Sequence, residues 1–250
     1  MELFYEIEGN GAPIVMIHSG GVDSRVWRYM VPELAKSFKI ITFDGRGTGR
    51  SPAMQEPTSL VEDLRKLLEH LGLDLVTLVG HSIGGQVATD FALSYPSMVE
   101  RLVVIAPSLT GFAYSQEFTN YMASVNAAAP DISKLVELSL AAPIYRATMA
   151  SPHRSFLTEM HNHYMTRVFT EWRSFEVLWP DPPSIERLEK IAASTLFIQG
   201  TIEWPDMYNI AEHFKRVPAI RFAEIKGADH MLVLTHAEEL ANSIRQFCHR

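Results

Sequence analysis

A serine flanked by glycines is the strongest chemical signal in this chain. Ser82 stands between Gly80 and Gly84 in the run Gly-His-Ser-Ile-Gly-Gly, after an apolar β-branched stretch and before a helix-like segment. Glycines leave out the Cβ atoms that would collide at a sharp strand-to-helix corner, and such a corner holds the serine hydroxyl at its tip. The N–H groups that open the following helix point to the same place. The pattern therefore predicts that Ser82 is a nucleophile.

A serine hydroxyl attacks a substrate only when a base removes its proton and a third group orients the base. In proteins with this corner, the partners follow in the order serine, acid, histidine. His230 ends the run Gly-Ala-Asp-His, between the last expected strand and the final expected helix, and is the candidate base. Glu203 and Asp206 both follow the preceding expected strand, where a carboxylate could reach His230.

Negative charge that develops on a tetrahedral intermediate needs N–H donors that are already in place. We expect one donor to be the backbone N–H of Ile83, at the start of the helix after Ser82. The second is expected from the loop His18-Ser19-Gly20-Gly21, which follows an early buried strand.

The remaining histidines have less specific explanations. We expect His81, inside the corner, to support the turn without taking the proton. His161 and His163 have a spacing that could suggest a metal site, but no third ligand follows at a convincing distance in the sequence. Packing or solvated roles are expected for both.

Composition excludes several function classes. The 250 residues are 47% hydrophobic and carry a net charge of −7, without a basic cluster, so nucleic-acid binding is not expected. The single cysteine, Cys248, cannot form an internal disulfide. The first residues show no signal-peptide pattern, and no apolar run is long enough to span a bilayer, so we expect a cytoplasmic protein with no membrane contact.

Strand and helix patterns alternate along most of the chain, which is typical of a parallel sheet covered by helices on both faces. A turn of the hairpin type is expected at Gly9-Asn10-Gly11, and a helix that ends at Gly72 is expected from Val61. The expected strands are residues 3–7, 14–17, 40–43, 75–79, 102–105, 195–198 and 220–223. From Gly111 to Ile185 the alternation stops, and aromatic-rich helical patterns indicate an insertion into this core.

Taken together, these motifs resemble the α/β-hydrolase superfamily over nearly the whole chain, including the loop Asp44-Gly-Arg-Gly-Thr-Gly-Arg-Ser51. The resemblance implies a mostly parallel eight-stranded sheet, with a helical cap between strands six and seven. The core would then be residues 1–110 and 186–250, and the cap residues 111–185. It also implies a Ser–acid–His triad, and it assigns the loop's oxyanion donor to Gly20 and a structural role to the Asp44–Ser51 loop.

The chain departs from the family pattern at two places. Ser19 stands where family members usually have glycine after the histidine. The usual aspartate position after the seventh strand is occupied by Glu203, which we favour as the acid, with Asp206 three residues later as the alternative.

The nucleophile narrows the reaction. Similar haloalkane dehalogenases and epoxide hydrolases carry aspartate where this chain has Ser82, so those two reactions are disfavoured. The sequence favours hydrolysis of small to medium apolar carboxylic esters through an acyl-enzyme, with a small-molecule substrate and no metal or organic cofactor. The alternatives are a carbon–carbon bond hydrolase of ring-fission products or an enol-lactonase, and, from another class, a slow ligand-binding receptor. The carbon–carbon enzymes usually have asparagine where this chain has His81. The oligomeric state is left open.

Overall fold

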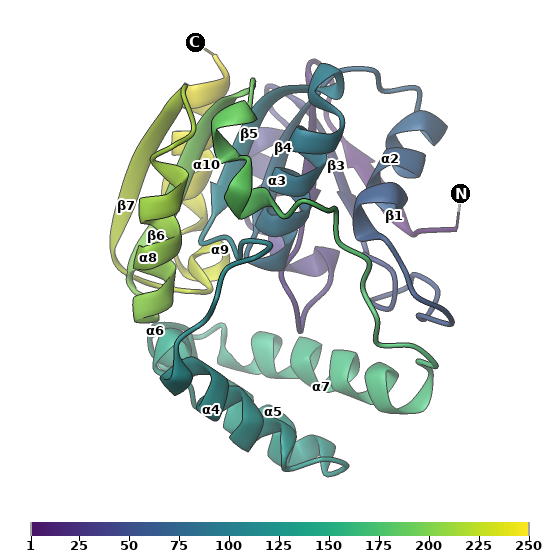
Figure 1. Ribbon diagram of the computed structural model, residues 1–250, viewed down its shortest axis with the longest axis vertical. Coiled ribbons are helices and arrows are strands. Elements are labelled where there is room, and N and C mark those ends of the chain that lie inside the picture. The colour runs from purple at the N-terminus through teal and green to yellow at the C-terminus, as the bar shows by residue number, and fades with distance from the viewer. Residues whose placement is uncertain (1, 250) are drawn as a thin grey trace.

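A seven-stranded sheet forms the centre of the protein in the computed structural model, which describes residues 2–249 (Figure 1). The strand order is β1-β3-β2-β4-β5-β6-β7. β1 pairs antiparallel with β3, and all the other pairs are parallel. The strands are β1 Tyr5–Glu8, β2 Pro13–Ile17, β3 Lys39–Phe43, β4 Val76–His81, β5 Val99–Ile105, β6 Ser194–Ile202 and β7 Ile220–Asp229.

Two hydrophobic cores lie on opposite faces of this sheet, because successive side chains of a strand point to opposite faces. In β2, Ile14 and Met16 belong to one core, and Val15 and Ile17 belong to the other. Helices α1 (Val31–Leu34), α9 (Leu232–Thr235) and α10 (Ala237–Cys248) cover the first face. Helices α2 (Leu60–His70), α3 (Ile83–Ser94) and α8 (Pro205–Phe214) cover the second. Both faces of the central strands are therefore buried.

The insertion lies between β5 and β6. It contains α4 (Gln116–Asn126), α5 (Ile132–Leu140), the short 3₁₀ helix Pro143–Tyr145, α6 (Arg146–Met149) and α7 (Arg154–Thr170). In Figure 1 these teal and green helices gather below one end of the sheet. Their two connections to the core meet at the buried carboxylate of Asp90 on α3, which accepts hydrogen bonds from the hydroxyls of Thr110 and Ser184.

The strand count is a correction to the eight strands that the family resemblance implied. The seven strands are those that the apolar runs of the sequence predicted, and residues 2–249 form no eighth strand in this sheet. The insertion accordingly lies between the fifth and sixth strands, and not between the sixth and seventh. The described sheet ends at β1, whose one neighbour is β3, and at β7, whose one neighbour is β6.

The turn at residues 9–11 also differs from expectation. Gly9 and Gly11 have positive φ values of 74° and 114°, as a tight turn requires. However, the strands that they connect are not neighbours, because β3 lies between β1 and β2. A Cβ on Gly9 would lie 2.3 Å from the carbonyl oxygen of Phe38, so the turn packs against the chain that leads into β3. Gly72, by contrast, follows α2 with a φ of 63°, as expected for a residue just past a helix end.

Candidate active site

Ser82 lies at a strained corner between β4 and α3. Its φ of 55° and ψ of −119° are unusual for a residue with a side chain. The corner is closed so tightly that a Cβ on Gly80 would lie 2.2 Å from the carbonyl oxygen of Gly84. A Cβ on Gly84 would in turn lie 2.2 Å from the carbonyl oxygen of Ile17. Both glycines of the motif are therefore required by backbone packing.

His230 and Glu203 are in direct contact. His230 follows β7, and its Nδ1 lies 3.0 and 3.1 Å from the two carboxylate oxygens of Glu203. The Glu203 side chain is completely buried. Burial lowers the pKa of His230, but the Glu203 carboxylate, with a smaller contribution from Asp229, outweighs it and raises this pKa above its ordinary value. With Nδ1–H donated to Glu203, Nε2 is left to exchange a proton with another group.

The backbone around His230 is held from two directions. His81, directly before Ser82, places its Nε2 2.7 Å from the carbonyl oxygen of His230. The backbone N–H of His230 donates to the carbonyl oxygen of Ile144 in the insertion, at 2.9 Å. The neighbouring Asp229 carboxylate accepts hydrogen bonds from the backbone N–H and the hydroxyl of Thr148, each at 2.7 Å. The insertion therefore helps to fix the loop that carries His230.

Asp206, the alternative acid, is engaged elsewhere. Its carboxylate accepts hydrogen bonds from the backbone N–H and the hydroxyl of Ser115, at 2.6 and 2.7 Å. Ser115 is the residue that caps the N-terminus of α4. The carboxylate at 206 thus fastens the start of the insertion to α8, and the carboxylate at 203 faces the histidine.

The loop that follows β2 is positioned by His18. Its Nδ1 lies 2.7 Å from the carbonyl oxygen of Ser19, and its Nε2 accepts a hydrogen bond from the backbone N–H of Gly45 at 2.9 Å. Gly20 follows Ser19 in this loop. If Gly20 carried a Cβ, its nearest neighbour would be Cγ2 of the Ile83 side chain, at 3.9 Å. Gly20 and the side chain of Ile83 therefore lie side by side, and both residues line the same cavities. Because Ile83 is the first residue of α3, its N–H has no partner within the helix.

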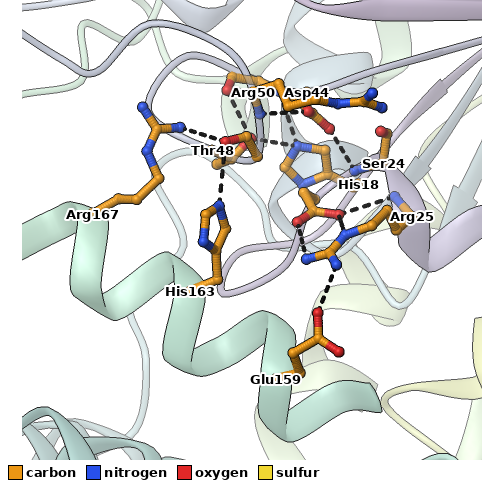
Figure 2. Close-up of polar contacts among 12 residues, drawn as sticks. His18, Ser24, Arg25, Asp44, Thr48, Arg50, Glu159, His163 and Arg167 are labelled. Carbon is orange, nitrogen blue, oxygen red and sulfur yellow. Dashed lines mark hydrogen bonds and ion pairs between the residues drawn. The ribbon is translucent and has the colours of Figure 1, made fainter.

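Helix α7 is docked onto the loops beside this site, as Figure 2 shows. Arg25 donates to Asp23 and also to Glu159 on α7, at 2.8 Å in each case. His163 and Arg167, further along α7, reach the carbonyl oxygen of Gly49 at 3.3 and 2.9 Å.

The loop that receives α7 is held from within by the carboxylate of Asp44. It accepts hydrogen bonds from the backbone N–H groups of Ser24 and Arg50, at 2.9 and 2.8 Å. These contacts give the Asp44–Ser51 segment the role of a connector between the core and the insertion.

Two cavities meet at the loop of residues 18–21. The serine chamber, about 310 Å³, is lined by Ser82 and His230 and by residues of the insertion. The apolar chamber, about 550 Å³, extends towards α2 and the segment after α7, with walls such as Met54, Val87, Val168 and Trp172. The two chambers share the residues Ser19, Gly20, Ile83, Tyr164 and Met165. The two chambers are therefore adjacent, with these five residues between them.

Two aromatic groups from the insertion enter the serine chamber, and sequence reasoning gave neither a functional role. Tyr145 is edge-on to the rings of both His230 and His161, with centroid separations of 6.3 and 6.0 Å. His161 lines the chamber, whereas His163 contacts Gly49, so the two imidazoles point to different surroundings. The aromatic content of residues 111–185 was the available signal, but it does not indicate which rings face the serine.

Two further features are absent from residues 2–249. No three histidine, cysteine, aspartate or glutamate side chains are grouped closely enough to hold a metal ion there. In the same part of the chain, we find no helix whose length and apolar content would let it cross a membrane.

Comparison with known proteins assigns the family. Residues 12–237 match the family described as alpha/beta hydrolase fold. The chain belongs to the alpha/beta hydrolase fold family. A bromoperoxidase from Bacillus anthracis has a similar solved structure, with a TM-score of 0.80 and 26% identity over 99% of this chain and 95% of that one.

Two curated relatives match over a shorter stretch. A soluble epoxide hydrolase from Corynebacterium sp. (strain C12) is 36% identical over 106 residues, which is 41% of this chain and 37% of that protein. A pimeloyl-[acyl-carrier protein] methyl ester esterase from Vibrio cholerae is 36% identical over 108 residues, which is 43% of this chain and 42% of that protein. These matches span well under half the length of either relative.

Proposed function

We propose that this protein is a serine hydrolase that cleaves carboxylic esters of small to medium apolar substrates through an acyl-enzyme intermediate. The observation that carries the proposal is the Glu203–His230 pair, which lies beside the cavity that Ser82 also lines. A serine at a strained corner, a histidine with a raised pKa and a buried carboxylate that orients it are the parts that activate a hydroxyl for acyl transfer.

In the proposed reaction, Ser82 Oγ attacks the ester carbonyl carbon while His230 Nε2 takes the hydroxyl proton. The backbone N–H groups of Gly20 and Ile83 stabilise the negative oxygen of the tetrahedral intermediate. His230 then gives its proton to the leaving alcohol, and the acyl group stays on Ser82. A water molecule deprotonated by His230 attacks the acyl-enzyme, and its collapse releases the acid and restores the Ser82 hydroxyl.

The similarity to an epoxide hydrolase does not extend that relative's activity to this chain. Serine at position 82 suits acyl transfer, whereas the aspartate that epoxide hydrolases carry suits opening of an epoxide. The similarity to a methyl ester esterase agrees with the chemistry of a serine nucleophile.

We assign residues 111–185 as a cap, since they supply Tyr145, His161 and Met165 to the serine chamber. The walls of the apolar chamber favour apolar arms on the substrate. Its charged wall residues, Arg46 and Asp63, form a two-point ion pair with each other, at 2.8 and 2.9 Å.

Replacement of Ser82 by alanine tests the proposal. We expect Ser82→Ala to abolish turnover of p-nitrophenyl butyrate, while its thermal melting curve and circular dichroism spectrum match those of the wild type. Asp206→Asn serves as the control, because it alters a buried carboxylate outside the proposed machinery, and it should retain turnover. Hydrolysis by Ser82→Ala at the wild-type rate would refute the assignment.

A further inference from the structure

A second imidazole is buried beside the proposed catalytic residues. His161 on α7 is 3% exposed and lines the serine chamber together with Ser82 and His230. Its ring packs against the loop of residues 18–21. A Cβ on Gly21 would lie 2.8 Å from both Cε1 and Nε2 of His161. Gly21 has a φ of 74°, so glycine at this position both permits the turn and makes room for the ring.

Within residues 2–249, no side chain uses the hydrogen-bonding capacity of this imidazole. Nδ1 makes no hydrogen bond of good geometry there, although the backbone of Leu157, one turn earlier on α7, lies close enough to raise the pKa of the ring. The Nε2 edge of the ring lies beside Gly21, which also lines the serine chamber. Burial lowers the pKa of His161 to about 4, so the ring is neutral near pH 7 and offers one donor and one acceptor. A buried polar group without a partner costs stability, and an apolar side chain would fill the same space without that cost.

Polar side chains line parts of both chambers, but His161 lines the serine chamber and not the apolar chamber. The serine chamber contains the hydroxyl-bearing residues Ser108, Ser139, Tyr114 and Tyr121 in addition to His161. The apolar chamber is lined mainly by aliphatic and aromatic side chains. A substrate that fills both chambers would place one side of its scissile ester next to His161 and the other side in the larger, mainly apolar chamber.

We propose that His161 is a substrate-contacting specificity residue, which forms a hydrogen bond with a polar group on the part of the ester that occupies the serine chamber. The inference rests on the proposed ester hydrolysis and narrows its substrate class. The preferred ester has a larger apolar arm, which enters the apolar chamber, and a small arm with a hydroxyl or a similar hydrogen-bonding group.

Pairs of esters that differ by a hydroxyl in place of a methyl group test this inference, because both groups have nearly the same size and a hydroxyl can either donate or accept. On the acyl side, the pair is p-nitrophenyl glycolate and p-nitrophenyl propionate. On the alcohol side, it is 2-hydroxyethyl butyrate and propyl butyrate. The quantity measured is the ratio of kcat/KM for the hydroxyl ester to kcat/KM for its methyl counterpart.

We expect His161→Leu to lower this ratio about fivefold in at least one pair, since one neutral hydrogen bond is lost. His161→Gln keeps a side-chain amide that can donate and accept, and its ratio should stay within about twofold of the wild type. His163→Leu is the matched control. It removes an imidazole from the same helix, and His163 lines neither chamber. Its ratio should equal that of the wild type.

The ratio separates substrate contact from a packing role, since a loosened site would slow both esters of a pair equally. An unchanged ratio in His161→Leu, with turnover that still depends on Ser82, would overturn the inference and leave the proposed function intact. Wild-type protein that hydrolyses none of the four esters in a Ser82-dependent manner would contradict the proposed function itself.

Discussion

His81 donates a hydrogen bond from Nε2 to the backbone carbonyl oxygen of His230 across 2.7 Å, although the two residues are 149 positions apart. Burial, followed by the proximity of His230, holds the pKa of His81 well below its ordinary value, so the ring stays neutral. The residue directly before the proposed nucleophile therefore fixes the backbone of the proposed base. This contact links the corner at Ser82 to the loop after β7.

We predict that His81→Leu lowers kcat by about ten- to a hundredfold and changes KM little, because a small displacement of a catalytic group has effects of this size. Steady-state kinetics on p-nitrophenyl butyrate measure both constants. A variant that melts near the wild-type temperature and keeps full kcat would show that the contact does not position His230.

Removal of the Glu203 charge should impair the base. We predict that Glu203→Gln lowers kcat/KM by about 10³- to 10⁴-fold, the loss that accompanies a misoriented histidine in related triads. The matched variant Asp206→Asn weakens the attachment to Ser115 and should stay within about tenfold of the wild type. Equal losses in both variants would contradict the assignment of Glu203 as the acid.

The same carboxylate should govern the pH profile. His230 must be neutral to take a proton, and its raised pKa places the acid limb of kcat/KM above pH 6.5. In Glu203→Gln the favourable charge is gone and the burial penalty persists, so the residual activity should extend to lower pH.

The same pKa shift links the stability of the fold to pH. Because the pKa of His230 is raised in the folded protein, the Glu203–His230 pair stabilises the fold fully below the unfolded pKa of about 6.5. This stabilisation is lost as the pH rises through the pKa that His230 has in the folded protein.

Backbone packing at the corner predicts a large stability effect at one glycine. Gly84→Ala places a Cβ 2.2 Å from the carbonyl oxygen of Ile17, and neither backbone can move freely, so we expect a loss of more than about 3 kcal/mol in the free energy of unfolding. At Gly72, no atom lies within 4 Å of an added Cβ, and Gly72→Ala should cost about 1–2 kcal/mol through its positive φ alone. Urea denaturation measures both values, and a smaller loss at Gly84 than at Gly72 would contradict the packing argument.

The apolar chamber should limit the length of the substrate. Val168→Trp introduces a large ring at a wall that lines this chamber and not the serine chamber. We expect kcat/KM for p-nitrophenyl hexanoate to fall at least tenfold, and kcat/KM for the acetate to change less than threefold. A loss that is the same for both esters would indicate that the longer acyl arm does not enter this cavity.

Local patterns predicted the elements well where each pattern has a single physical cause. The runs at 14–17 and 40–43 alternate between two buried faces. The corner at Ser82 needs Gly80 and Gly84, because a Cβ at either position would collide with neighbouring backbone. The strand count was wrong where it came from the resemblance alone. The hairpin expectation at residues 9–11 was wrong in its pairing, since a turn signal does not specify which strand lies beside β1.

The site could be anticipated only in part, because its remaining contacts join segments far apart in the chain. The sequence placed both Glu203 and Asp206 after β6 and favoured Glu203 through the family resemblance. The hydrogen bonds of Ser115 to Asp206 now distinguish the surroundings of the two carboxylates. The roles of Ile144, Tyr145 and His161 depend on how the insertion folds back over the sheet. Aromatic composition does not specify which side chains of the insertion face the cavity. The catalytic roles themselves stay predictions.

Labelling with a serine-directed p-nitrophenyl alkylphosphonate tests the central claim most directly. Intact-mass and peptide mass spectrometry should show one phosphonate adduct, on the peptide that contains Ser82, together with complete loss of esterase activity. No adduct should form on Ser82→Ala. An adduct on a different residue, or esterase activity that survives full labelling of Ser82, would contradict the account.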